Sequence, residues 1–149
     1  MNSRALLLGF VAGIAFLGGC NDPLTPEDLA GTYSLTRLDS RALPQLLSAT
    51  ISCDESVESG ELILESTGAY SLQLRGTLDC TRDGGPIQTI GWDFPGTFSM
   101  SGRALQFVSP VYPSGELHFA GQIDPFHTGI RILDLELQLS KVVDLEFRR

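Results

Sequence analysis

Three cysteines are the residues of this chain best suited to covalent chemistry. Cys53 and Cys80 form an even pair in the body of the sequence, and neither lies in a Cys-Xaa-Xaa-Cys spacing or beside a histidine. This context disfavours redox or nucleophilic chemistry, which needs a thiolate stabilised by its neighbours. In an oxidising compartment the pair is expected to form a disulfide that stabilises the fold by about 3 kcal/mol. The alternative is two buried free thiols.

The third cysteine, Cys20, ends a different pattern. Arg4 is followed by an apolar run, Ala5 to Phe16, and then by Leu17-Gly18-Gly19-Cys20. A short basic start, an apolar middle and small residues at the end are typical of a secretory signal. The last four residues resemble the lipobox of bacterial lipoproteins, in which the cysteine is acylated and becomes the new N-terminus. The resemblance implies a signal peptide at residues 1–19 and a lipid on Cys20.

The alternatives for this segment are a retained transmembrane helix and a plain secretory signal. A spanning helix needs about 20 apolar residues, whereas the 15 residues from Ala5 to Gly19 include four glycines and are followed by polar Asn21. Acyl chains such as palmitate contribute about 0.8 kcal/mol per buried methylene, so that more than one chain gives a stable anchor. The resemblance therefore implies a membrane-anchored protein of the bacterial cell envelope. In the lipoproteins of enteric bacteria, an Asp directly after the cysteine is the signal for retention in the inner membrane. Here Asn21 occupies that position and the Asp comes one residue later, at Asp22. The periplasmic face of the outer membrane is therefore favoured.

Composition limits what the remaining chain can do. Residues 20–149 number 130, with nine basic and 18 acidic side chains and a net charge of −9. This length is that of one domain with a real core. Such acidity excludes nucleic acid as a partner, because nucleic-acid binding depends on Lys and Arg that contact phosphates. We expect a single domain over 31–149, behind a short tether at 20–30, and a monomer.

No set of residues supports an enzyme, a metal site or a cofactor. His118 alternates with apolar neighbours and is expected to face water, and His127 lies in a loop near Asp124. Two histidines without ligand spacing or cysteine partners are a weak basis for a metal site. Neither a nucleophile elbow nor a glycine-rich phosphate loop is present. We therefore expect no catalytic residues and no cofactor.

Alternation of apolar and polar residues dominates the chain after Gly31. Thr25 and Pro26 begin a helical turn that Gly31 ends, and Pro44 to Ala49 could form one further turn at most. The rest predicts about eight or nine antiparallel strands, each with one face dry and the other wet. The inward rows are expected to be Tyr70, Leu72 and Leu74; Leu105 and Phe107; Leu117 and Phe119; Leu133, Leu135, Leu137 and Leu139; and Val143, Leu145 and Phe147.

One hairpin relates this pattern to the cysteines. A strand over Glu61–Glu65 is expected to turn at Thr67-Gly68 and to return as Ala69–Arg75. Extending both arms beyond the hairpin brings Cys53 and Cys80 to nearly opposite positions. The disulfide would therefore close the open end of that hairpin.

A helical turn followed by Gly31-Thr32-Tyr33 and then by antiparallel strands resembles a small lipocalin-like barrel. In lipocalins the first strand carries Gly-Xaa-Trp, and the Trp packs under an Arg from the last strand; here Tyr33 stands at the Trp position. The resemblance implies an all-β, up-and-down barrel closed by Tyr33 and Arg148, or Arg149. The chain is also similar to uncharacterised bacterial lipoproteins of this build. A β-sandwich is the alternative fold, because short strands with Gly and Pro turns fit either.

Two functions remain open for such a barrel. An eight-stranded barrel is just wide enough to hold one small apolar ligand or to be filled by its own side chains. In the first case the protein binds the ligand; in the second it is a structural or accessory envelope lipoprotein that acts through protein contacts. The candidate lining residues are Tyr33, Leu35, Tyr70, Leu72, Phe98, Phe107, Phe119 and Leu135.

Overall fold

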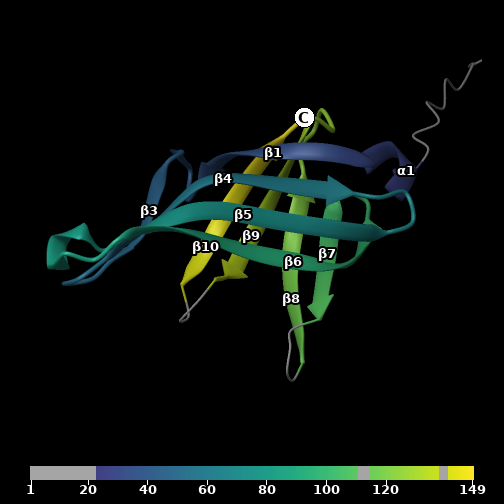
Figure 1. Ribbon diagram of the computed structural model, residues 1–149. Helices are drawn as coiled ribbons and strands as arrows, with labels where there is room; N and C mark the ends of the chain where they lie inside the picture. Colours follow the sequence, from purple (N-terminus) through teal and green to yellow (C-terminus); the bar gives the residue numbers. More distant parts are fainter. Residues whose placement is uncertain (1–22, 111–114, 138–140) are drawn as a thin grey trace, which may run out of the picture.

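A computed structural model describes residues 23–110, 115–137 and 141–149, and one antiparallel sheet organises them (Figure 1). The proposed signal peptide and Cys20 lie outside the described residues. Within the described ranges, no helix is long and apolar enough to cross a membrane.

The chain enters the sheet through α1 (Pro26–Leu29), the short helical turn that the sequence predicts. The backbone N–H and the hydroxyl of Thr25 both donate to the Asp28 carboxylate, each at 2.8 Å, which fixes the first turn. Leu29 is fully buried and so anchors the turn to the core. Ten strands follow among the described residues: β1 (Gly31–Leu38), β2 (Arg41–Ala42), β3 (Gln45–Ala49), β4 (Asp54–Leu64), β5 (Ala69–Asp79), β6 (Ile87–Ser101), β7 (Ala104–Pro110), β8 (Glu116–Ile123), β9 (Gly129–Glu136) and β10 (Val142–Arg148).

Eight of these strands close into a barrel. Consecutive strands from β4 to β10 pair as antiparallel neighbours, and β1 pairs with β10 on one side and β4 on the other. The registers Tyr33↔Leu62 and Leu35↔Phe147 give the two seams at β1. The all-β, up-and-down barrel predicted from the sequence is thereby confirmed, and the sandwich alternative is excluded because a single sheet closes on itself.

β4, β5 and β6 extend beyond the barrel, and their outer ends form a small sheet together with β3. β3 pairs with residues 54–57 of β4, which in turn pair with 76–79 of β5, and these pair with 87–90 of β6. We call this four-stranded part the extension. It projects from the barrel on the side opposite α1 and ends in the small helix η1 (Thr81–Asp83) (Figure 1).

The extension corrects one prediction. Residues 45–49 form a strand and not a helical turn. Leu47 is buried at 5 % exposure, and Gln45 pairs with Val57 of β4. This pairing depends on a partner strand that is distant from the local pattern, so the Pro44-containing segment alone could not indicate it.

The alternating rows point inward as expected on most strands. Leu72 and Leu74 of β5, Phe107 of β7 and Leu145 of β10 are completely buried. On β9 the register changes: Ile130 and Ile132 are buried, then Leu135 and Leu137, whereas Leu133 is only half-buried. The predicted row over 133–139 is therefore wrong at Leu133, and Leu139 lies outside the described residues.

The cause of this change is a local irregularity at Asp134. Its φ angle is +51°, a left-handed conformation that Asp tolerates better than most residues. The Asp134 backbone N–H donates to the Asp144 carboxylate at 3.1 Å, and the pairing of β9 with β10 shifts at the same place. A bulge of this kind moves all following side chains to the other face.

Candidate functional site

The barrel interior is the first candidate site, because the sequence predicts a possible ligand cavity there. All eight candidate lining residues are buried, with exposures from 0 to 7 %. Five are aromatic, and four of these contact one another: the Phe107 ring stacks on Phe119 at 5.0 Å, meets the edge of Tyr70 at 5.0 Å and lies 6.2 Å from Phe98. These contacts fill the centre of the barrel with its own side chains.

Two polar atoms in this core have no hydrogen-bond partner among the described residues, the Tyr70 hydroxyl and the Trp92 indole N–H. Burial raises the pKa of Tyr70 to about 12, although the neighbouring Ser109 hydroxyl acts to lower this pKa. Ser109 itself donates to the Pro95 carbonyl at 2.7 Å. The two unpartnered groups are the polar contacts that the interior could offer to a small molecule.

The end of the barrel near α1 is closed by Tyr33. Its hydroxyl donates to the Leu29 carbonyl at 2.8 Å, and the Arg149 guanidinium lies 4.7 Å from the ring centre. Arg149 also donates to the Ala30 carbonyl at 2.9 Å. Burial raises the pKa of Tyr33, although the nearby Arg149 charge acts in the opposite direction. Packing of a guanidinium over a ring contributes about 0.5–2 kcal/mol.

The arginine over Tyr33 is thus Arg149, the second of the two candidates that the resemblance implies, and not Arg148. On β10 the buried positions are Val143, Leu145 and Phe147, so Arg148 points outward. Its guanidinium contacts the Asp124 carboxylate at 2.5 Å. Only the residue beyond the strand end is free to turn back over the mouth of the barrel.

A surface cavity of about 250 Å³ lies beside this ion pair, on the outside of the barrel. Three arginines line it, which would favour an anion, but each is already engaged. Arg148 binds Asp124, and Arg131 binds Asp144 at 2.6 Å. Arg103 directs its Nε and Nη2 to the Ile123 carbonyl at 2.9 and 2.8 Å. The cavity therefore offers no uncommitted cation to a ligand.

The histidines lie apart from each other and outside the barrel. His118 on β8 is exposed and contacts Glu116 at 3.2 Å, in agreement with its predicted outward position. His127 lies in the loop before β9 and has a φ of +57°. Among the described residues, no group of three His, Cys, Asp or Glu side chains is arranged to hold a metal ion.

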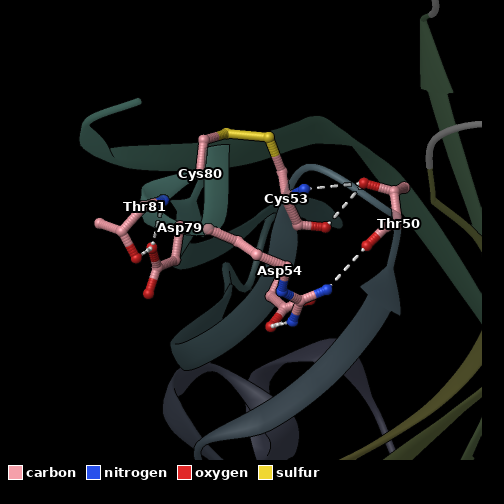
Figure 2. The surroundings of a disulfide bond; sticks show 7 residues. Thr50, Cys53, Asp54, Asp79, Cys80 and Thr81 are labelled. Atoms are coloured by element: carbon pink, nitrogen blue, oxygen red, sulfur yellow. Dashed lines mark hydrogen bonds and ion pairs between the residues drawn. A yellow bond between two sulfur atoms is a disulfide. The ribbon is translucent and has the colours of Figure 1, made fainter. Parts of the chain in front are cut away.

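The predicted disulfide is confirmed and lies at the tip of the extension. Figure 2 shows Cys53, just before β4, joined to Cys80, just after β5, with Cα atoms 4.1 Å apart. The Thr50 hydroxyl accepts from the Cys53 N–H at 2.9 Å and donates to the Cys53 carbonyl at 2.8 Å. Arg82 donates to Asp54 at 2.9 Å and to the Thr50 carbonyl at 3.1 Å. These bonds close the turn between Thr50 and Cys53 and connect it to η1.

The same tip carries unusual apolar exposure. Of the five large hydrophobic side chains that are exposed among the described residues, three lie on the extension: Leu46 at 50 %, Ile51 at 89 % and Ile87 at 61 %. Scattered exposed side chains are normal, but a concentration on one projecting element indicates a contact surface. Sequence reasoning missed this surface, because the exposure depends on how far the strands extend past the barrel.

The extension also has an unpaired edge. β6 pairs with β5 over residues 87–97, but β7 pairs only with residues 97–101 of β6. No described residue pairs with the other side of residues 87–92, which we call the open edge. An edge of this kind presents backbone N–H and C=O groups to any strand that can add to it.

A comparison of the chain with protein-family models and with curated proteins finds no match. The function is therefore inferred from the fold and from the surfaces that the fold exposes.

Proposed function

We propose that this protein is a lipid-anchored cell-envelope lipoprotein whose barrel is a packed scaffold and which acts through protein contacts. The observation that carries this proposal is the contrast between the two regions. The eight candidate lining residues are buried against one another, whereas the exposed apolar side chains Leu46, Ile51 and Ile87 gather on the extension. A filled core leaves the outer surface as the functional part of the molecule.

The membrane anchor is proposed at Cys20. Its support is the order of Arg4, the apolar run and Leu17-Gly18-Gly19-Cys20, which resembles the lipobox. Cys53 and Cys80 are joined to each other, so Cys20 is the cysteine left for acylation. A short tether then keeps α1 near the bilayer and directs the extension away from it, because the two lie at opposite ends of the molecule (Figure 1). The periplasmic face of the outer membrane is the proposed location.

Metabolic labelling with a palmitate analogue tests the anchor. The unaltered chain is expected to label and to fractionate with membranes, and Cys20→Ser to do neither. The control is the double variant Cys53→Ser/Cys80→Ser, which removes two thiols but keeps Cys20 and should label normally. If Cys20→Ser still labels and stays with membranes, the anchor is wrong.

A small apolar ligand remains the second candidate, favoured by the unpartnered Tyr70 hydroxyl and Trp92 N–H. Trp92 is only 6 % exposed, so its fluorescence reports on the interior. Native mass spectrometry of the purified chain is expected to find no lipid other than the acyl chains on Cys20, and added fatty acid should leave Trp92 emission unchanged. A stoichiometric lipid with a spectral shift would overturn the packed scaffold and establish the binding function.

A further inference from the structure

The open edge of β6 has the properties of a strand that pairs with another chain. Residues 87–92 are Ile-Gln-Thr-Ile-Gly-Trp and contain no charged residue and no proline. Natural proteins usually protect a free edge with lysine, proline or a covering element. The nearest charge on this strand, Asp93, is bound to Arg75 of β5 at 2.9 Å. Within the described residues the edge is therefore neutral and uncovered.

The extension also holds this edge in a fixed shape. The open edge pairs with β5 through registers such as Thr77↔Thr89 and Gly76↔Ile90. β5 is in turn held to β4 by the disulfide and by the Arg82–Asp54 contact. A preorganised edge loses little conformational freedom when a strand is added, which favours association.

We infer that the occupant of the open edge is the same edge of a second copy, which gives a two-fold dimer with one continuous sheet across both extensions. This inference deepens the proposed function and rests on it, because it names the partner of the extension. An antiparallel strand pair is self-complementary about a two-fold axis, as an isologous dimer requires. It replaces the monomer that the sequence predicts.

Side-chain sizes select the register. If the axis passes through Thr89, residue 87 of one copy lies opposite residue 91 of the other. Arg75 of the same copy already lies across Gly91, so Ile87, which is 61 % exposed, would pack on the aliphatic part of that side chain, and this happens twice. At the axis the two Thr89 side chains face each other, a cross-strand pair that stabilises sheets. All three positions lie on the same exposed face of β6.

Charge restricts the register in which a second copy can pair. The mature chain has a net charge of −9, so two copies repel each other except where both surfaces are neutral. With the axis at Thr89 no carboxylate of the open edge opposes another. A lipid surface is a poor occupant, because the extension lies at the end of the molecule opposite α1, where the anchor begins (Figure 1). Dimerisation should strengthen with salt, which screens the remaining repulsion.

Sedimentation of the full chain in neutral detergent tests the inference. The unaltered chain is expected to dimerise, and Thr89→Glu, which opposes two carboxylates at the axis, should weaken association about tenfold or more. Thr97→Glu is the matched control, because Thr97 lies on the same strand and face but pairs on both sides, with Ala69 and Val108. A monomeric unaltered chain, or equal effects of both variants, would overturn the inference.

Cross-linking keeps the test decisive if Thr89→Glu does not fold. Under oxidation Thr89→Cys is expected to form a covalent dimer across the axis, since opposed residues of a non-hydrogen-bonded pair have Cβ atoms about 4.5 Å apart, which a disulfide can span. Thr97→Cys should remain monomeric. If Thr89→Cys does not cross-link while the chain is acylated and free of lipid ligand, only the dimer is wrong. If acylation is absent, the proposed anchor is wrong, whatever the cross-link shows.

Discussion

The barrel and the extension share β4, β5 and β6 but are stabilised in different ways. In the barrel every strand has neighbours on both sides, and a central aromatic group, Tyr70, Phe98, Phe107 and Phe119, fills the interior. In the extension no described residue pairs with the outer side of β3 or with residues 87–92 of β6, and a disulfide with its surrounding hydrogen bonds holds the tip.

The difference shows where this small domain can make contacts. A closed barrel has no strand edges, so it cannot accept another strand. An open sheet with few neighbours is weak alone, because a short ribbon needs further strands or a covered face. The Cys53–Cys80 disulfide lies in the extension, where the strands have fewer neighbours than in the barrel, and the unpaired backbone groups lie in the same region. Along β4, β5 and β6, the barrel part therefore provides packing stability, and the extension part provides backbone groups that can bind another strand.

The largest predicted effect concerns the barrel core. Phe107→Ala removes a ring that is 0 % exposed and contacts Tyr70, Phe98 and Phe119. We expect a loss of about 3–5 kcal/mol in the free energy of unfolding, measured by chemical denaturation. The control is Phe126→Ala, at 81 % exposure, which should change stability by less than about 0.5 kcal/mol. Similar losses of unfolding free energy for both variants would mean that the central aromatic group does not stabilise the barrel.

The second prediction concerns the disulfide. Cys53→Ser/Cys80→Ser removes a cross-link between residues 27 apart in sequence. The loss is expected to be about 3 kcal/mol, because the unfolded chain regains freedom. Hydrogen exchange should show faster opening at 45–57 and 75–91 than at 69–74. Uniform acceleration over both regions would contradict the separation of barrel and extension.

The third prediction concerns the junction between the two regions. A Cβ atom on Gly76 would overlap the Ser56 carbonyl oxygen, at the point where the pairing of β4 with β5 shifts between Val57 and Ser59. Because backbone and not a flexible side chain blocks the site, Gly76→Ala should cost about 1–3 kcal/mol.

Gly91→Ala is the matched control for this change. A Cβ there would meet the Arg75 guanidinium at 2.7 Å, and the end of that side chain can move aside. Thermal unfolding of dilute samples is expected to show a clearly lower midpoint for the Gly76 variant only. Equal midpoints would mean that the backbones at the junction can separate without cost.

The sequence predicts the barrel well, because its signal is local. Apolar residues at every second position on β5 and β10 predict which faces are buried, and Leu72, Leu74 and Leu145 are indeed fully buried. The hairpin around Gly68 also places the cysteines correctly, since strand length on both arms fixes their positions. Alternation of apolar and polar residues, together with the turn residues, is sufficient to predict the buried face wherever a strand is regular.

The sequence fails where distant residues decide the outcome. The change at Leu133 follows from the bond between Asp134 and Asp144, ten positions later. The strand at β3 exists because β4 supplies a partner, and the choice between Arg148 and Arg149 over Tyr33 falls on Arg149 because Asp124 holds Arg148. The open edge depends on β6 extending past the point where β7 ends. None of these relations appears in a local pattern.

The smallest predicted effect concerns two aspartates whose carboxylates accept hydrogen bonds within loops, one in the barrel and one in the extension. Asp124 closes the barrel loop before β9. Burial acts to raise its pKa, but hydrogen bonds from Thr128 and Gly129 and the Arg148 charge hold the pKa below its usual value. In the extension, bonds from Thr81 also lower the pKa of Asp79.

A lowered carboxyl pKa adds stability that is present above the unfolded value of 3.8 and is lost as pH falls through the folded value. Unfolding measured by denaturant between neutral pH and about pH 2 should therefore show a loss that begins near pH 4. Asp124→Asn is expected to flatten this loss more than Asp79→Asn, because the Asp124 carboxylate accepts from the Arg148 guanidinium as well as from Thr128, whereas among the described residues the Asp79 carboxylate accepts from Thr81 alone. The reverse order would place the acid-sensitive contact in the extension and not in the barrel.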